Sequence, residues 1–310
     1  MRIAIASSSL VSKPLVDRIL QSKYQFVGFL TLPARRVGRG RQYQENAITE
    51  YVLGKQVEIF KPENFEEIAD CLELMRPDLV ITASYGKLIP KYLLDRPKYG
   101  WLNIHFSLLP RWRGAAPAQW AILSGDGKSG ISIFKLDEGM DTGPLYLQVE
   151  YPLNESVTTE ILLHDLAELS ATHILSVVEM IEAGQAPTPQ VATGSTRAPK
   201  IAKDYGLIDW NTPSQSILRK IRALGVRPGV FTFVNGRKIN IHQASELREF
   251  ERERTPGEIF FIENDLAIRT QDSALAITQV TPAGAKRMSG ADFARGARLV
   301  GGERCFLDGR

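Results

Sequence analysis

Apolar residues in the first half of the chain gather in short runs that are separated by longer amphipathic segments. The short runs have the length of buried strands and cover residues 2–6, 25–30, 56–60, 78–84 and 100–107. The segments between them repeat their apolar positions at helical spacing and predict helices over residues 12–22, 46–54 and 63–75. This alternation is typical of an α/β fold with a mostly parallel sheet.

Two further apolar runs, at 130–136 and 145–151, flank a glycine-rich segment, and helical spacing predicts a long helix over 158–184. The chain then becomes rich in Gly, Pro, Ser and Thr, a composition typical of linkers. We therefore expect a first domain over residues 1–184 and a linker over residues 185–207.

The remaining residues, 208–310, carry the pattern of an all-β domain. Residues 230–244 alternate apolar and polar side chains around Asn235-Gly236, a dipeptide that accepts the positive φ angles of a type I′ hairpin turn. Shorter apolar runs follow at 257–262, 266–270 and 274–280. We expect this domain to fold as a small, OB-like β-barrel.

The charge of the chain is nearly balanced, because 38 basic residues face 35 acidic ones, and the net charge of +3 favours no polyanionic partner by itself. The distribution is uneven, however, since residues 211–310 hold 16 basic and 11 acidic side chains. An early segment contains no acid and four arginines, Arg35, Arg36, Arg39 and Arg41. Such a segment either binds nucleic-acid phosphates or forms a solvated loop.

Cysteine content and hydropathy argue against several classes of protein. Cys71 and Cys305 have no Cys or His at ligand spacing, so neither a disulfide framework nor a metal site is expected. The amino-terminal apolar run is too short for a signal peptide, and no later stretch is expected to reach membrane length. We expect a cytoplasmic monomer that contacts no membrane.

The densest group of chemically useful side chains lies in residues 103–117. On a strand, Asn103, His105 and Ser107 share one face, because side chains alternate between faces. An Asn amide can polarise a carbonyl and an imidazole changes charge near neutral pH, so this pair is suited to stabilising an oxyanion. The competing interpretation is a pair of structural residues at a strand end.

A second candidate group contains Asp137, Glu138 and Asp141, interspersed with Gly139 and Gly143. A carboxylate on such a turn can orient a nearby imidazole and favour its charged form. The alternative is ordinary turn chemistry, in which Asp accepts hydrogen bonds from its own downstream amides. A metal site built from the three carboxylates is less favoured, because no His lies nearby in the sequence.

Together these motifs resemble the folate-dependent formyltransferase family. The resemblance rests on Asn103-x-His105-x-Ser107-Leu-Leu-Pro110, the following Arg-Gly-Ala-Ala-Pro, and Asp141-Thr-Gly. Further matches to the branch that formylates initiator tRNA extend it over nearly the whole chain, at residues 83–90, 198–210, 221–229 and 282–293 and in the arginine-rich loop. The chain departs from the family at Ser7-Ser8-Ser9, where Gly-Thr-Pro is usual, and at Ser132, where threonine is common.

The resemblance implies a Rossmann-like formyltransferase domain, a linker and a tRNA-binding β-barrel. It implies formyl transfer from 10-formyltetrahydrofolate to the α-amino group of methionine on initiator tRNA, with direct attack by the amine and no covalent enzyme intermediate. Asn103 and a protonated His105 would stabilise the oxyanion, and Asp141 would pair with His105 and relay the amine proton. The residues implied to bind folate are Ser107, Leu108, Leu109, Pro110, Tyr85 and Gly86. Those implied to bind tRNA are Arg35, Arg36, Arg39 and Arg41.

Two alternatives remain open at this point. One keeps the chemistry and changes the acceptor to a nucleotide sugar or a purine precursor, which would have less need of the arginine-rich loop and the basic second domain. The other is an RNA-binding protein built on a catalytic fold that has lost its activity. Asn103, His105 and Asp141 argue against it, because all three chemical types are intact.

Overall fold

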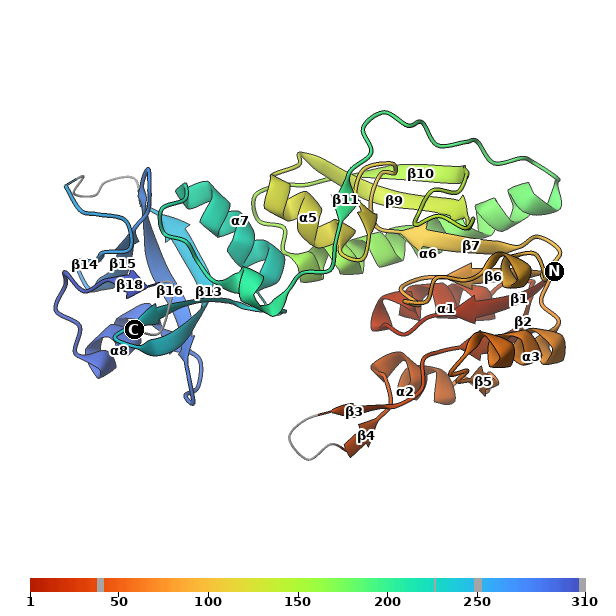
Figure 1. Cartoon of the computed structure of the whole chain (residues 1–310), viewed down its shortest axis with the longest axis horizontal. Helices are drawn as coiled ribbons and strands as arrows, with labels where there is room; N and C mark the ends of the chain where they lie inside the picture. The colour runs from red at the N-terminus through yellow and green to blue at the C-terminus, as the bar shows by residue number, and fades with distance from the viewer. Residues whose placement is uncertain (38–41, 226, 248–252, 307–310) are drawn as a thin grey trace. The chain divides into compact units, whose positions relative to one another are not determined.

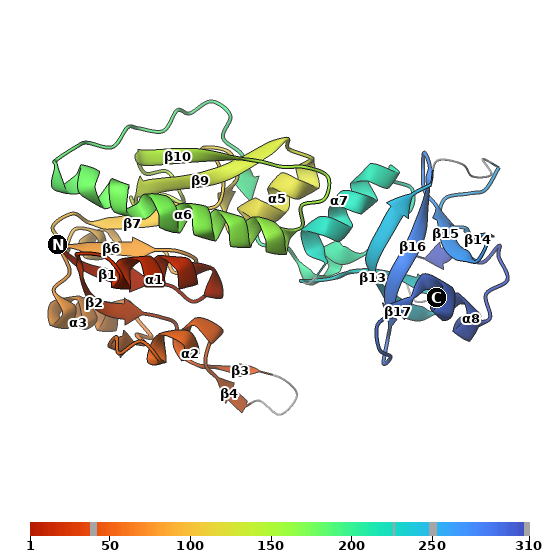
Figure 2. The same cartoon turned by 180° about the vertical axis from the view of Figure 1, so that it is seen from behind.

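The computed structural model describes residues 1–37, 42–225, 227–247 and 253–306 (Figures 1 and 2). Two compact units make up the chain. The first comprises Met1–Ala118, Gly127–Leu153 and Glu160–Pro199. The second comprises Gln119–Asp126, Asn154–Thr159 and Lys200–Arg310.

A seven-stranded sheet forms the centre of the first unit, in the order β10-β9-β7-β6-β1-β2-β5. Its strands are β1 (Arg2–Ala6), β2 (Gln25–Leu30), β5 (Ile59–Phe60), β6 (Leu79–Thr82), β7 (Trp101–His105), β9 (Lys128–Lys135) and β10 (Leu145–Pro152). The five strands from β5 to β7 run parallel, and β9 is antiparallel to both of its neighbours. The predicted mostly parallel α/β sheet is therefore confirmed.

The helical segments of the first part of the chain are η1 (Leu10–Ser12), α1 (Lys13–Leu20), α2 (Ala47–Leu53), α3 (Phe65–Met75), α4 (Lys91–Leu94), α5 (Pro117–Ser124) and α6 (Thr159–Glu182). The apolar face of α3 contributes Ile68 and Leu72 to a buried cluster that also contains Val80 of β6 and Trp101 of β7. The Trp101 indole also donates a hydrogen bond to the Leu93 carbonyl (2.9 Å). This cluster holds β7 in place, because the burial of each large apolar side chain contributes roughly 1.5–3 kcal/mol to the stability of the fold.

Helix α6 is the one helix of the described residues that is long and apolar enough to cross a membrane, by length and composition alone. No stretch of that kind was expected from the sequence. Its buried residues recur every three or four positions, at Leu162, Leu166, Ser170, Ile174, Val177 and Ile181, which is the pattern of a helix that covers a protein core.

The order of the strands reverses between β1 and β6, since the chain first adds β2 and β5 on one side of β1 and then adds β6 and β7 on the other. In open α/β sheets the crevice beyond the carboxyl ends of strands at such a point is the usual place for a ligand. The segments that follow β1 and β6 meet there, because the amide and the hydroxyl of Ser8 both donate to the Ser84 carbonyl (3.2 and 2.8 Å).

The second unit contains a curled antiparallel sheet (Figure 1). Its strand order is β14-β15-β16-β13-β12-β18, and β17 pairs with β16. Its strands are β12 (Val230–Val234), β13 (Arg237–Glu246), β14 (Ile259–Ile262), β15 (Asp265–Arg269), β16 (Ala274–Pro282), β17 (Met288–Ser289) and β18 (Cys305–Phe306). The predicted hairpin is present, with positive φ angles of 48° at Asn235 and 74° at Gly236. The β-domain is thus confirmed as a half-barrel, to which the structure adds η2 (Lys203–Gly206), α7 (Ser214–Leu224) and α8 (Gly290–Ala297).

Two short strand pairs were not predicted. Strands β3 (Arg35–Val37) and β4 (Gln42–Gln44) form an antiparallel hairpin from the arginine-rich segment. Strand β8 (Arg113–Gly114) pairs in parallel with β11 (Arg197–Ala198), although β11 lies in the stretch whose composition is typical of a linker. The second pair therefore brings that stretch onto the first unit.

Candidate active site

Asn103 lies on the central strand β7, where its amide is oriented by the neighbouring strand. Thr82 of β6 pairs with Asn103 in the parallel ladder, and the shorter of its two hydroxyl contacts is a donation to Oδ1 of Asn103 (2.7 Å). Among the described residues, Nδ2 of Asn103 has no hydrogen-bond partner. The half-buried amide therefore presents its N–H groups to whatever binds beside the sheet.

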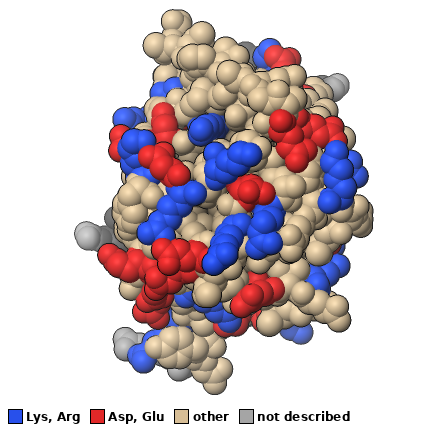
Figure 3. Space-filling view, turned by 90° about the vertical axis from the view of Figure 1, so that its right-hand side faces the viewer, with Lys and Arg blue, Asp and Glu red and all other residues tan. Residues whose placement is uncertain are grey.

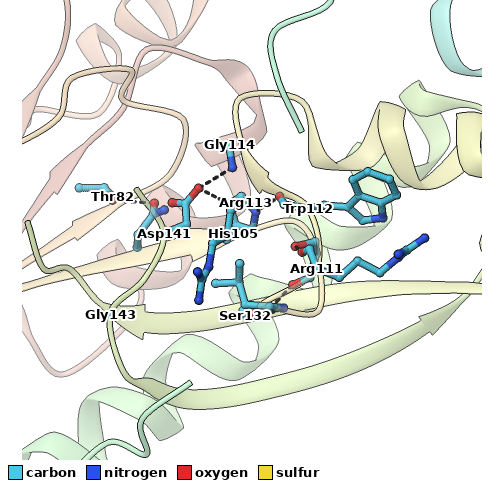
Figure 4. A network of polar contacts seen from close by, with 12 residues as sticks. Thr82, His105, Arg111, Trp112, Arg113, Gly114, Ser132, Asp141 and Gly143 are labelled. Atoms are coloured by element: carbon cyan, nitrogen blue, oxygen red, sulfur yellow. Dashed lines mark hydrogen bonds and ion pairs between the residues drawn. The ribbon is translucent and has the colours of Figure 1, made fainter. Parts of the chain in front are cut away.

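His105 lies two residues further along β7, on the same face, and is 5% exposed. Its Nε2 lies 2.8 Å from the carbonyl oxygen of Trp112 (Figure 4). A carbonyl can only accept, so Nε2 carries a proton and Nδ1 is the nitrogen left for another partner. Nδ1 lies 3.7 Å from Oδ2 of Asp141, which is within ion-pair range but too long for a hydrogen bond.

Asp141 is held in place through its backbone and its carboxylate. Its φ angle of 55° lies in the left-handed region, which is uncommon for residues other than glycine. Its Oδ2 accepts a hydrogen bond from the Gly114 amide (2.8 Å), which leaves Oδ1 to other partners. Gly114 itself has a φ of 125° and no room for a Cβ, which would stand 2.7 Å from the Ala198 carbonyl oxygen.

The neighbouring acidic residues have different surroundings. Asp137 caps its own turn, because its Oδ1 accepts from the Gly139 amide (3.0 Å) and from the Thr142 hydroxyl (2.7 Å). The turn-chemistry interpretation therefore holds for Asp137, whereas Asp141 faces the imidazole. In the part of the chain that the structure describes, no group of three or more His, Cys, Asp or Glu side chains is arranged to hold a metal ion.

The turn from Ser107 to Pro110 is fixed by the hydroxyl of Ser132, which lies opposite His105 in the β7–β9 ladder. This fully buried hydroxyl donates to the Ser107 carbonyl (2.7 Å) and accepts from the Leu109 amide (3.0 Å). It also accepts from Nε2 of Gln148 (2.9 Å), which donates to the Leu109 carbonyl as well (2.8 Å). One serine thus joins β9, β10 and the turn.

Tyr85 and Gly86 follow β6, at the reversal point of the sheet. The Tyr85 side chain belongs to the apolar cluster beneath α3 and is 3% exposed. Its hydroxyl has no hydrogen-bond partner among the described residues, and its pKa is raised, chiefly by burial and secondarily by the neighbouring Cys71. Gly86 has a φ of 81° with open space where a Cβ would stand. A ligand at this point would therefore meet backbone groups.

The arginine-rich hairpin exposes Arg35 and Arg36, and the guanidinium of Arg36 lies 5.2 Å from the centre of the exposed Tyr43 ring. Arg39 and Arg41 lie outside the described residues. Elsewhere on the surface, basic and acidic side chains are interspersed over the face that Figure 3 presents, as the nearly balanced composition leads one to expect. Any attraction of a polyanion therefore depends on local groups of basic side chains and not on the total charge of the chain.

Two family models match the chain, one in its first part and one in its last part. Residues 1–178 match the family described as Formyl transferase, and residues 200–298 match Formyl transferase, C-terminal domain. The fold and the two matches define the class of this enzyme as a formyl transferase.

Relatives that match over almost the whole chain identify the family within this class. The methionyl-tRNA formyltransferase of Bacillus licheniformis is 35% identical over 313 residues, which cover 99% of this chain and 98% of the relative. That of Thermobifida fusca is 34% identical, covering 98% of this chain and 99% of the relative. The chain therefore belongs to the methionyl-tRNA formyltransferase family.

Solved structures share the fold at lower identity. HypX from Aquifex aeolicus in complex with tetrahydrofolic acid has a TM-score of 0.64 and 21% identity, covering 95% of this chain but 47% of HypX. The methionyl-tRNA formyltransferase from Clostridium thermocellum has a TM-score of 0.57 and 19% identity, covering 82% of this chain and 95% of that protein. At these identities the likeness concerns the fold alone.

The structure brings Asn103, His105, Asp141 and the Ser107 turn together, and it adds partners that sequence reasoning missed. Thr82 was within the predicted strand 78–84 and could have been found from the order of the strands, which places it beside β7. Gly114 was visible as part of the Arg-Gly-Ala-Ala-Pro motif. Gln148 gives no such signal, because an isolated glutamine on a strand has no distinctive spacing.

Replacing Ser132 by alanine should loosen the turn. The Ser132→Ala variant leaves the buried Leu109 amide without its acceptor, and an unmade buried hydrogen bond costs about 1–3 kcal/mol. We expect the melting temperature of the full chain to fall. Ser132→Thr retains the hydroxyl and is the control. Equal melting temperatures for Ser132→Ala and the parent would show that the hydroxyl does not hold the turn.

Proposed function

We propose that this chain transfers the formyl group of 10-formyltetrahydrofolate to the α-amino group of methionine on initiator tRNA. Relatives of this name match over the full length of the chain. The observation that carries the proposal at the site is the orientation of Asn103, whose Oδ1 is occupied by Thr82 while its N–H groups have no partner among the described residues. An amide held in this way suits a developing oxyanion.

In the proposed reaction, the neutral amine attacks the formyl carbon and the carbonyl oxygen becomes negative. The Nδ2 of Asn103 donates to this oxygen. His105 contributes from Nδ1, because Nε2 is already engaged by the Trp112 carbonyl. A protonated Nδ1 places a positive charge and a donor on the side of the imidazole that has no hydrogen bond.

The proton balance involves Asp141. The attacking nitrogen loses one proton and the departing N10 of the folate gains one. The Asp141 carboxylate lies beside Nδ1 and has one oxygen anchored by the Gly114 amide, so its other oxygen accepts the amine proton directly or through water. The same proton then passes to N10 as the bond between the formyl carbon and N10 breaks, which regenerates the carboxylate. No group on the enzyme forms a covalent bond with the formyl carbon. This agrees with a sequence that lacks a G-x-S-x-G nucleophile elbow.

The donor molecule is assigned to the turn Ser107, Leu108, Leu109 and Pro110 and to the segment that contains Tyr85 and Gly86. Backbone groups supply the polar contacts, because the Tyr85 side chain is buried in the core. The tRNA is assigned to Arg35, Arg36, Arg39 and Arg41 and to basic side chains of the second unit, which bind phosphates without reading sequence.

The decisive test is enzymatic. Purified protein is incubated with 10-formyltetrahydrofolate and either aminoacylated initiator tRNA or elongator Met-tRNA, and N-formylmethionine is quantified after deacylation. We expect formylation of the initiator and much less of the elongator. Absent or equal modification of the two would refute the proposal, and formylation of an amino sugar nucleotide under the same conditions would favour the alternative acceptor.

The oxyanion assignment predicts large effects at β7. Asn103→Ala, His105→Ala and Asp141→Ala should each lower kcat strongly, and removal of one oxyanion donor typically costs 10²–10³-fold. Asn103→Asp, of the same shape, replaces the donor by an acceptor and should be at least as damaging. Each variant should keep the parental circular dichroism and melting behaviour. A kcat close to that of the parent would remove the altered residue from the mechanism.

Thr82 provides a finer test, because its proposed role in the reaction is to orient Asn103. Thr82→Val is similar in shape and removes the hydroxyl, so the amide is free to turn, and we expect kcat to fall by roughly tenfold with little change in the KM of either substrate. Thr82→Ser should restore kcat. Equal rates for the Val and Ser variants would mean that the hydroxyl does not orient the amide.

The hairpin assignment predicts a change in salt dependence. Arg36→Ala should raise the KM for tRNA and reduce the slope of log KM against log salt concentration by about 0.7–0.9 if one phosphate contact is lost. Arg18→Ala, which removes an exposed arginine from α1, is the control. If the two variants have the same KM and the same slope as the parent, Arg36 belongs to a solvated hairpin.

A further inference from the structure

Residues 187–198, here named the strap, lie in the stretch predicted to be a linker but are bonded to the first unit at both ends. At one end, Thr188 and Leu145 exchange backbone hydrogen bonds of 2.7 and 2.8 Å. At the other end, β11 pairs with β8, and the Ala116 amide donates to the Ala198 carbonyl (3.2 Å). Between these ends, two side chains of the strap contact the segments that carry the site.

Gln190 is bonded to the loop of Asp141 by both hydrogens of its amide. Its Nε2 donates to the Asp141 carbonyl (2.9 Å) and to the Gly143 carbonyl (2.8 Å), and its Oε1 accepts from the guanidinium of Arg113 (2.6 Å). The two carbonyls belong to Asp141, whose backbone is left-handed, and to the residue two positions after it. A non-glycine residue in this conformation persists only when its surroundings hold it, and Gln190 supplies that restraint.

Thr196 is bonded to the segment that fixes His105. Its Oγ1 accepts from the amide of Trp112 (2.9 Å), and its carbonyl accepts from the amide of Arg113 (2.9 Å). Trp112 also has a positive φ angle, of 64°, and its carbonyl is the acceptor for Nε2 of His105. The strap therefore holds the residue that sets the tautomer of the imidazole.

We propose that Gln190 and Thr196 are positioning residues for the transfer reaction, Gln190 acting through Asp141 and Thr196 acting through His105. The inference rests on the proposed function for the roles of those two residues. The hydrogen bonds of the Gln190 and Thr196 side chains go to backbone groups and to Arg113. Their effect is to hold the Asp141 carboxylate and the Nδ1 of His105 in fixed positions relative to each other. A displacement of about 1 Å can lower the rate by up to 10²-fold.

Side-chain replacement separates positioning from packing. Gln190→Met keeps the length of the side chain and loses all three hydrogen bonds. Gln190→Glu keeps an acceptor for Arg113, but it places a carboxylate oxygen beside the two carbonyl oxygens, and these oxygens repel one another. Gln185→Met, at an exposed position just before the strap, is the matched control. We expect both Gln190 variants to lose roughly 10- to 100-fold in kcat, with KM for each substrate within about twofold, and the control to match the parent.

Thr196 is tested in the same way. Thr196→Val removes the acceptor for the Trp112 amide, Thr196→Ser restores it, and Thr193→Val alters an exposed threonine of the strap as a control. We expect a loss of kcat in the first variant alone. A loss of the same size in Thr196→Ser would overturn the positioning role of the hydroxyl.

A double variant shows whether Gln190 acts through Asp141. In an Asp141→Asn background, Gln190→Met should cause little further loss of kcat, because residues that act as one unit are not additive. A merely structural role would instead multiply the two losses, and that outcome would overturn the proposal.

A spectroscopic readout keeps this test separate from the test of function. In protein with ¹⁵N-labelled histidine, the His105 signals are assigned by their loss in His105→Ala. We expect Gln190→Met to shift them toward those of Asp141→Asn. If Met-tRNA is not formylated, the proposed function fails, while the spectrum still decides on the strap. Signals of Gln190→Met identical to those of the parent would overturn the inference whatever the activity.

Discussion

The ladder of β6, β7 and β9 is the constraint on which the site depends. Its register sets Thr82 beside Asn103 and Ser132 opposite His105, so the amide, the imidazole and the turn are placed by the same backbone hydrogen bonds. A shift of one residue would turn all of these side chains to the other face of the sheet. The buried Trp101 at the start of β7 anchors this register.

Elements with a strong local signal were predictable from the sequence. The strands of the first unit follow the apolar runs, and the Asn235-Gly236 hairpin follows from a dipeptide that accepts two positive φ angles. The face shared by Asn103 and His105 follows from strand alternation. These features depend on neighbouring residues in the chain, so the sequence contains the information directly.

Features that depend on distant contacts were not predictable in the same way. The composition of residues 185–200 is that of a flexible linker, yet two backbone pairings and the side chains of Gln190 and Thr196 tie it to the first unit. Likewise, composition and spacing alone do not distinguish Asp137 from Asp141, and only the family resemblance pointed to Asp141. The structure gives the physical difference, because Asp137 caps a turn and Asp141 faces the imidazole.

The position of the strap in the chain has a consequence for biosynthesis. A ribosome makes β7 and the Asp141 loop first, and Gln190 and Thr196 emerge about 50 residues after Asp141. The sheet can form before these restraints exist, whereas the geometry around His105 is complete only once the strap has been synthesised. A chain interrupted before residue 187 would therefore lack the hydrogen bonds by which Gln190 and Thr196 hold the Asp141 loop and the Trp112 segment.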